Sequence, residues 1–212
     1  MKDNRNYIFN VDDKITVRPE YLYIENWVTE GARVIDLGCG DGSLLALLKE
    51  KKKISGFGIE ITESGVRSCH KNGVNVAIGR IDKELRDISD DAFDFAICNV
   101  TLQMVMYPEM TLKEMKRISK YQIVSFPNFA YLLNRLELLF KGRMPRRLLG
   151  GYDWYNTGHI HQFSIKDFKE IITNLIRLKI KDCCYYGGMR KLNIIFPNLL
   201  AAGAIFLTEK QV

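Results

Sequence analysis

An apolar segment over residues 33–37 runs into a glycine-rich loop that could hold a polar cofactor. The segment carries a carboxylate at Asp36, and alternating glycines follow it at Gly38, Gly40 and Gly42. Glycine accepts positive φ and lets backbone N–H groups approach a ligand that a Cβ would push away. The spacing therefore predicts a strand followed by a loop that wraps around a cofactor.

The spacing of the glycines argues against a dinucleotide. The dinucleotide fingerprint G-x-G-x-x-G/A would require Gly or Ala where the chain has Ser43, and Asp36 would repel a pyrophosphate. Glu60 ends the next expected strand, about 20 residues further on, where an acid hydrogen-bonds ribose hydroxyls in such folds. An adenosine ligand with a ribose, no phosphate and an ammonium group near Asp36 is S-adenosylmethionine. A glycine turn that serves packing alone is the alternative, and Asp36 together with Glu60 argues against it.

Helices and strands are expected to alternate around this loop. Pro19 suits the first turn of a helix, and apolar residues recur at helical spacing behind it. The expected helices cover residues 19–28, 44–48 and 110–119 with another opening at Thr62, and the expected strands cover residues 54–59, 74–78, 93–98 and 122–126. This alternation predicts a parallel sheet with right-handed crossovers that binds ligands at the carboxyl ends of its strands.

The pattern changes at Asn128. A helix over 131–140 and a long glycine-containing stretch over 141–162 follow, so residues 128–163 are expected to border the pocket. Ser164 can cap the next helix with Asp167 at its third position, and strands near 180–186 and 200–207 complete the chain. We expect one domain over 18–212 behind a flexible lead-in, residues 1–17.

Composition is typical of one globular domain. The chain has 212 residues, 47% of them hydrophobic, and a formal net charge of +6, which by itself does not establish nucleic-acid binding. Five cysteines without a C-x-x-C pair predict neither a disulfide framework nor a zinc site. No apolar stretch of signal-peptide or membrane-span length is present, so we expect a soluble, cytoplasmic protein.

Several segments together carry a family resemblance. They are Val34 to Gly42, Gly73 to Val76, Thr101 to Gln103, Ile123 to Phe129, Gly142 to Pro145, and Trp154 to Thr157 followed by Ile160 and His161. On these segments, nearly over its full length, the chain closely resembles the methionine-biosynthesis protein MetW family. That family belongs to the class I methyltransferase-like superfamily.

The resemblance implies a fold, a cofactor and a partner. The implied fold is the Rossmann-like α/β class I methyltransferase fold, a three-layer αβα arrangement whose seven-stranded, mostly parallel sheet has an antiparallel last strand. It also implies a pocket for S-adenosylmethionine, or S-adenosylhomocysteine as product, and a place in methionine biosynthesis beside a homoserine O-acyltransferase. By position, the implied cofactor residues are Asp36, Gly38, Cys39, Gly40 and Asp41 near the methionine end, Glu60 on the ribose, Asn99 beside the sulfonium, and Ile61, Ile81 and Asp82 around the adenine.

The chain departs from the family pattern at the adenine end. The family places an Asp directly behind the glycine that follows the third strand, whereas here Arg80 follows Gly79. Asp82 could substitute by reaching back. Otherwise adenosyl affinity falls by the worth of one hydrogen bond to a charged group, roughly 1.5–3 kcal/mol.

Candidate catalytic residues gather in one loop. A methyltransferase mainly has to align a nucleophile and, for weak nucleophiles, remove a proton. Tyr155, His159 and His161 are the candidates for the substrate wall and base, and a structural role is favoured for His161. Two histidines without further Cys or His partners make a poor metal site, so no metal is expected. Asn99 is followed by Val100 rather than by the Pro-Pro-Tyr of N-methyltransferases, which disfavours methylation of bases or glutamine.

Two functions remain open. In the first, the protein is a cofactor-binding subunit that supports or regulates homoserine O-acyltransferase. In the second, it methylates an unidentified small molecule. Lys141, Arg143, Arg146 and Arg147 form a basic patch, and the favoured interpretation is a solvated loop. If the patch binds a partner, the acyltransferase is the preferred one. Nucleic acid is not expected to bind.

Overall fold

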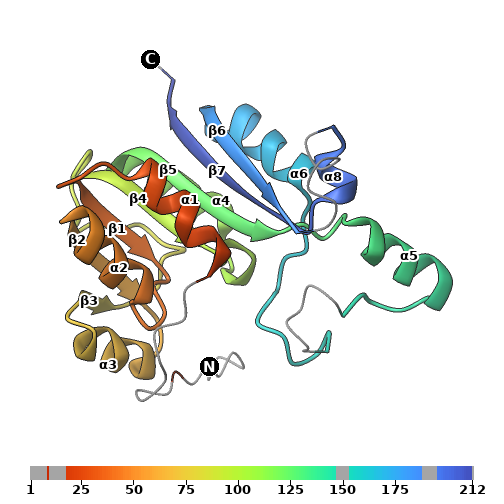
Figure 1. Cartoon of the computed structure of the whole chain (residues 1–212), viewed down its shortest axis with the longest axis horizontal. Helices are drawn as coiled ribbons and strands as arrows, with labels where there is room; N and C mark the ends of the chain where they lie inside the picture. Colours follow the sequence, from red (N-terminus) through yellow and green to blue (C-terminus); the bar gives the residue numbers. More distant parts are fainter. Residues whose placement is uncertain (1–8, 10–17, 147–152, 188–194, 212) are drawn as a thin grey trace.

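A seven-stranded sheet forms the centre of the protein (Figure 1). The computed structural model describes residues 9, 18–146, 153–187 and 195–211. The strands are β1 (Arg33–Leu37), β2 (Ser55–Glu60), β3 (Asn75–Ile78), β4 (Phe93–Asn99), β5 (Ser119–Pro127), β6 (Leu178–Tyr186) and β7 (Gly203–Lys210), in the order β3-β2-β1-β4-β5-β7-β6. β1 to β5 pair in parallel, and β7 is antiparallel to both β5 and β6. The predicted fold class is confirmed.

Helices cover both faces of the sheet. One face carries α1 (Pro19–Trp27), α2 (Ser43–Lys52) and α3 (Glu63–Lys71); the other carries the 3-10 turn η1 (Leu102–Met104), α4 (Pro108–Ile118), and α6 (Ile165–Glu170) with the π-helical turn η3 (Ile171–Ile176). Side chains alternate along a strand. Val34 of β1 accordingly packs with α1 and α2, while Ile35 and Leu37 pack with α4 and α6. This alternation produces two apolar cores, one on each side of the sheet.

The last part of the chain differs in detail from the prediction. The helix predicted at Ser164 is confirmed with its capping box: the Asp167 N–H donates to Ser164 Oγ at 3.2 Å, and the Ser164 N–H donates to Asp167 Oδ2 at 2.8 Å. The final strand was predicted over 200–207 but begins at Gly203. The reason is that Pro197 opens the short helix α8 (Pro197–Leu200), whose last N–H donates to Phe196 O.

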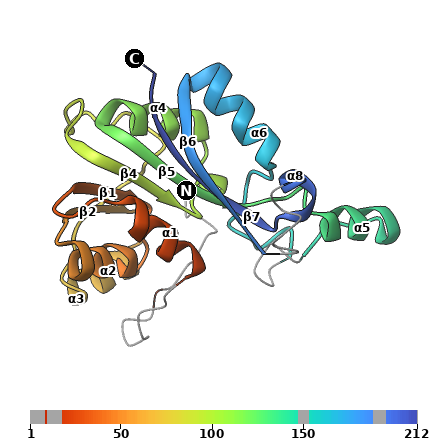
Figure 2. The ribbon, with the colours of Figure 1, turned by 45° about the horizontal axis from the view of Figure 1, so that its top comes forward.

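Helix α5 (Leu132–Lys141) stands out from the rest of the molecule in both views (Figures 1 and 2). It follows the carboxyl end of β5, and its exposed side carries the apolar side chains of Leu138, Leu139 and Phe140. No helix among the described residues is long and apolar enough to cross a membrane.

Candidate functional site

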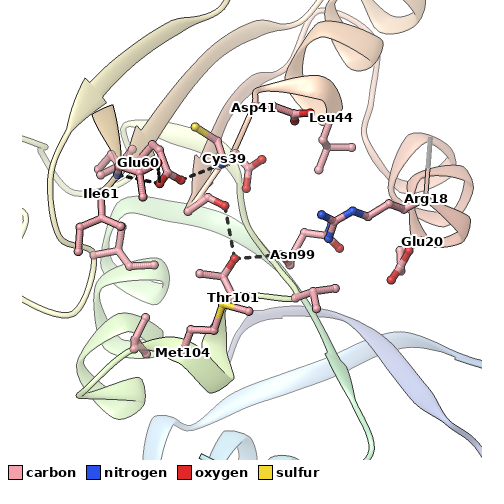
Figure 3. A pocket seen from close by; sticks show the side chains of 18 of the residues that line it. Arg18, Glu20, Cys39, Asp41, Leu44, Glu60, Ile61, Asn99, Thr101 and Met104 are labelled. Atoms are coloured by element: carbon pink, nitrogen blue, oxygen red, sulfur yellow. Dashed lines mark hydrogen bonds between the residues drawn. The ribbon is translucent and has the colours of Figure 1, made fainter. Parts of the chain in front are cut away.

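A cavity of about 520 Å³ lies at the carboxyl ends of β1, β2 and β4 (Figure 3). Parallel α/β sheets bind ligands at this edge. All the residues predicted to hold the cofactor are in its wall: Asp36, Gly38, Cys39, Gly40, Asp41, Glu60, Ile61, Ile81, Asp82 and Asn99. One cavity thus brings together residues from the ends of four separate strands.

The glycine loop needs its glycines. Gly38, Gly40 and Gly42 have φ of +81°, +59° and +76°, where an L side chain is strained. A Cβ on Gly38 would collide with the Thr101 side chain, and one on Gly40 would lie 3.1 Å from the ring of Phe9. The Gly38 N–H donates to Ile59 O at 2.8 Å, which fixes the loop to the end of β2.

Asp36 is a buried carboxylate with an unused acceptor. The residue is 2% exposed, and its Oδ1 has no hydrogen-bond partner in the described part of the chain. Burial first, and then the negative charge of Glu60, raise the pKa of Asp36 to about 7, while Arg18 acts in the opposite direction. Buried polar atoms are normally hydrogen-bonded, so this oxygen is suited to a donor supplied by a ligand.

Glu60 is held in place by the backbone around it. Its Oε2 accepts the Gly40 N–H at 2.9 Å, and its Oε1 accepts both the N–H and the hydroxyl of Thr62 at 2.9 Å. Thr62 also caps α3 by accepting the Gly65 N–H at 3.1 Å. The carboxylate thus links the glycine loop to the start of α3 at the edge of the cavity.

The chain turns sharply after β4, beside the middle of the cavity. Val100 has φ of +52°, an uncommon value for a β-branched residue. Its N–H donates to both O and Oγ of Ser125, each at 3.0 Å, and the Ser125 hydroxyl donates to Asn99 Oδ1 at 2.5 Å. These bonds hold the strained turn and leave Asn99 in the cavity wall.

Asp82, which the resemblance places near the adenine, accepts three hydrogen bonds. Arg80 donates from Nε to Asp82 Oδ1 at 2.9 Å and from Nη2 to Oδ2 at 2.8 Å, and the Met106 N–H donates to Oδ2 at 2.8 Å. Burial opposes ionisation, but the bonds from Arg80 and Met106 outweigh it and lower the pKa of Asp82. The positive charge of Arg80 is therefore paired. A carboxylate has about four acceptor positions, so these three bonds leave one position on Asp82 Oδ1 unused.

Sequence comparison identifies the family. The model of the family described as methionine biosynthesis protein MetW matches residues 18–208. The chain belongs to the MetW family. A relative, the bifunctional methionine biosynthesis protein MetXA/MetW of Rhodopirellula baltica, is 31% identical over 174 residues, which are 78% of this chain and 28% of that protein. The chain thus spans less than a third of that relative.

Solved structures of low sequence identity share the fold of this MetW-family chain. A methyltransferase from Thermotoga maritima, described as S-adenosylmethionine-dependent and a possible histamine N-methyltransferase, has a TM-score of 0.64 at 20% identity and covers 91% of this chain and 87% of its own. An S-adenosylmethionine-dependent methyltransferase from Archaeoglobus fulgidus has a TM-score of 0.65 at 17% identity, over 90% and 91% of the two chains. At these identities the likeness shows the fold alone.

The loop candidates of this MetW-family chain lie in three different settings. His159 is in the cavity wall, and burial lowers the pKa of its imidazole. His161 lies outside that wall, with Nε2 3.4 Å from Met106 O. The backbone N–H groups of Ile160 and His161 both donate to Gln103 O at 3.0 Å, which ties the loop to η1. Tyr155 is 69% exposed and is absent from the wall.

Other parts of the MetW-family chain add wall residues that the sequence analysis did not single out. They include Arg18 and Glu20 from the start of α1, Tyr186 from the end of β6, and Pro127 and Ala202 beside β5 and β7. The signal available for the first two was a pair of opposite charges around Pro19, at the start of a helix expected to lie near the cofactor. Tyr186 had no signal of its own, since only the folded sheet brings β6 to this edge.

The predicted basic patch is largely paired. Arg143 lies 3.0 Å and Lys141 3.7 Å from the Glu137 carboxylate, and Arg146 lies 2.6 Å from that of Asp153. Arg147 is outside the described residues. Within the described ranges, no cluster of three or more His, Cys, Asp or Glu side chains could hold a metal ion.

Proposed function

We propose that this MetW-family protein binds S-adenosylmethionine or S-adenosylhomocysteine and acts with, or regulates, a homoserine O-acyltransferase of methionine biosynthesis. The observation that supports this cofactor is the buried Oδ1 of Asp36 near the end of β1, which has no hydrogen-bond partner among the described residues and lies just before the crowded glycine loop. S-adenosylmethionine offers an ammonium group to such an oxygen. When bound, it would supply an activated methyl group.

Arg18 fits the other charge of the methionine end. Its guanidinium makes no side-chain hydrogen bond or ion pair with the residues that the structure describes, and its positive charge acts on Asp36. Figure 3 shows it extending from the start of α1 toward Asn99. A zwitterionic amino-acid group therefore finds a carboxylate at Asp36 and a cation at Arg18 in the same cavity. We assign the methionine carboxylate to Arg18.

Glu60 and the two isoleucines fit the adenosine. A carboxylate has about four acceptor positions, and Gly40 and Thr62 use three of those on Glu60. Oε2 can therefore still accept a ribose hydroxyl. Ile61, which is 48% exposed, and Ile81 offer apolar surface beside it for the adenine ring.

The partner rests on the Rhodopirellula relative, whose printed name joins MetXA and MetW in one bifunctional chain. Fusion keeps two proteins at a high effective concentration, which favours pairs that work together. A cofactor that binds the complex and the free protein with different affinity would couple cofactor level to acyltransferase activity.

The test is calorimetric titration of the purified protein with S-adenosylmethionine and S-adenosylhomocysteine, alone and with the acyltransferase from the same organism. We expect saturable binding and an affinity that changes when the partner is present. The protein should also change acyltransferase activity without any methyl acceptor. If neither ligand binds in either setting, the cofactor part of the proposal is wrong and only protein contacts remain.

A small-molecule methyltransferase is the second candidate. The observation in its favour is that the cavity continues beyond Asn99 to His159, whose pKa is lowered and whose imidazole is therefore available as a proton acceptor. Formation of S-adenosylhomocysteine that depends on an added acceptor would select this function over the first.

A further inference from the structure

A second compartment of the cavity lies on the side away from Glu60 and Ile61. Figure 3 shows Glu20 together with Arg18 on that side, across the cavity from both residues. Its other walls come from the ends of three strands, with Pro127 at the end of β5, Tyr186 at the end of β6 and Ala202 before β7. Apart from Arg18, which is assigned to the methionine carboxylate, none of these residues has a role in binding the cofactor. The compartment can therefore take a second ligand.

Glu20 places a buried carboxylate in this compartment. The residue is 7% exposed although it carries a carboxylate, and Oε2 has no hydrogen-bond partner in the described part of the chain. Arg18 does not form an ion pair with it within the described residues, and Arg18 is already assigned to the methionine carboxylate. A buried carboxylate that meets no cation is costly. The ligand should therefore bring a positive charge to Glu20.

The neighbours of Glu20 favour an alkylammonium group over a metal ion. Tyr186 lies next to the Glu20 carboxylate: burial first, then the charge of Glu20 and a hydrogen bond with it, raise the pKa of the Tyr186 phenol, so among the described residues Glu20 has a neutral partner but no cation. The Tyr186 hydroxyl donates to Phe126 O at 3.3 Å, and the ring packs against Gly203, where a Cβ would collide with it. An aromatic face attracts organic cations, and Pro127 and Ala202 offer apolar surface to an alkyl chain.

We propose that this compartment, the acceptor chamber, binds a small aliphatic primary amine as its ammonium form, with the charge on Glu20 and the chain against Tyr186 and Pro127. The proposal rests on the cofactor site of the proposed function, because it takes Arg18 to be engaged there. It names a substrate class for the second candidate function. As a methyl acceptor, the bound ammonium group would first lose a proton to the Glu20 carboxylate, which gives the nitrogen its lone pair. The free aliphatic amine is a stronger nucleophile than the ring and amide nitrogens that the missing Pro-Pro-Tyr signature disfavours.

The test is calorimetric titration of the full chain, loaded with S-adenosylhomocysteine at pH 7.5, with n-propylamine hydrochloride. Propan-1-ol and sodium propionate, of similar size but without the positive charge, serve as probe controls at matched ionic strength. Glu20→Gln removes the charge at nearly constant shape. Glu30→Gln removes the same charge from an exposed position just beyond α1 and is the matched variant.

We expect propylamine, but neither control, to bind the wild-type protein, at least tenfold weaker binding to Glu20→Gln, and no change in Glu30→Gln. Glu20→Gln should keep its affinity for S-adenosylhomocysteine within about threefold. The chamber is disproved if propylamine does not bind or binds both variants equally, or if Glu20→Gln loses S-adenosylhomocysteine, since Glu20 would then belong to the cofactor site. Failure of the wild type to bind S-adenosylhomocysteine would instead refute the proposed function, and propylamine binding would then be judged by the same criteria on the ligand-free protein.

Discussion

Asp36 and Glu60 are two buried carboxylates in one cavity, and the chain treats them differently. Glu60 accepts three hydrogen bonds from Gly40 and Thr62, whereas Asp36 has an oxygen without a partner among the described residues. The pKa of Asp36 is raised to about 7 as a result, chiefly by burial. Asp36 is thus the carboxylate whose charge state changes near neutral pH, and a bound ammonium group would favour its ionised form.

The first prediction is a pH dependence of cofactor affinity. Because the pKa of Asp36 is near 7 in the ligand-free protein, its ionised fraction rises about tenfold between pH 6 and pH 8. Affinity for S-adenosylhomocysteine should rise by about the same factor, with release of a proton below pH 7. Calorimetry in buffers of different ionisation enthalpy measures both quantities.

Asp36→Asn is the control for this pH effect. The amide has nearly the same shape but cannot ionise, so binding should be weak and nearly independent of pH. Wild-type affinity that is flat between pH 6 and pH 8 would show that the ammonium group is bound elsewhere.

Some residues of the cavity wall could be predicted from the sequence, and others could not. The glycine loop, Asp36 and Glu60 were identified because their residue types and spacing are characteristic within one short segment and the strand that follows it. Arg18, Glu20 and Tyr186 were not, because they reach the cavity only through the packing of α1 and β6. Arg80 was recognised as a departure, but its pairing with Asp82 needed the structure.

The glycine loop requires glycine for two reasons, the positive φ of its backbone and the close packing of neighbouring side chains. Gly31 and Gly38 both have positive φ, of +72° and +81°. A Cβ on Gly31 would meet nothing within 4 Å, whereas one on Gly38 would collide with Thr101. A substitution at Gly31 therefore tests backbone strain alone, whereas one at Gly38 tests strain together with steric crowding.

The second prediction compares Gly38→Ala with Gly31→Ala. Gly31→Ala should lower the free energy of unfolding by about 1–2 kcal/mol, the cost of a left-handed Ala. Gly38→Ala should cost about 1–3 kcal/mol more because of overpacking, and should weaken S-adenosylhomocysteine binding. Urea denaturation and calorimetry measure the two effects. Equal losses of stability would mean that Thr101 moves aside at no cost.

Helix α5 exposes large apolar side chains that the rest of the described chain does not cover. Leu139 and Phe140 are 74% and 78% exposed, and Leu138 is 50% exposed. Exposed apolar patches of this kind mark interaction surfaces. The described cations of the basic patch, Lys141, Arg143 and Arg146, form ion pairs with Glu137 and Asp153. We therefore expect the acyltransferase to use the apolar side of α5 rather than the basic patch.

The third prediction concerns two negative charges introduced on the apolar side of α5. Leu139→Glu combined with Phe140→Glu should weaken the complex with the acyltransferase at least tenfold, because a carboxylate would be buried without a partner. Binding of S-adenosylhomocysteine to the isolated protein should not change. Leu175→Glu in η3, where the leucine is 55% exposed, is the matched control. If both proteins bind the acyltransferase as the wild type does, α5 is not the docking surface.

For the whole molecule, the alternation of apolar strands and helices was enough to predict a parallel sheet, and the cavity lies at the carboxyl ends of its strands. The place of β7 between β5 and β6 was not contained in that alternation, and its antiparallel direction came from the family resemblance. The later start of β7 at Gly203 reflects Pro197, because the helical turn that it opens includes Leu200 and the Ala201 N–H donates to Pro197 O.

The last prediction concerns the coupling of these parts by a ligand. The cavity wall is built from α1, the glycine loop and the ends of β2, β4, β5 and β6, so a bound molecule touches elements from most of the chain. At a free concentration 100 times its Kd, S-adenosylhomocysteine should add about 2.7 kcal/mol to the free energy of unfolding. For a chain of this size, that is a rise in Tm of roughly 5–10 °C. Adenosine, which lacks the methionine end, should give a smaller rise at the same concentration, and Asp36→Asn should reduce the difference between the two. If adenosine and S-adenosylhomocysteine stabilise the protein equally, the ends of α1 and β1 take no part in binding, and the assignments of Asp36 and Arg18 are wrong.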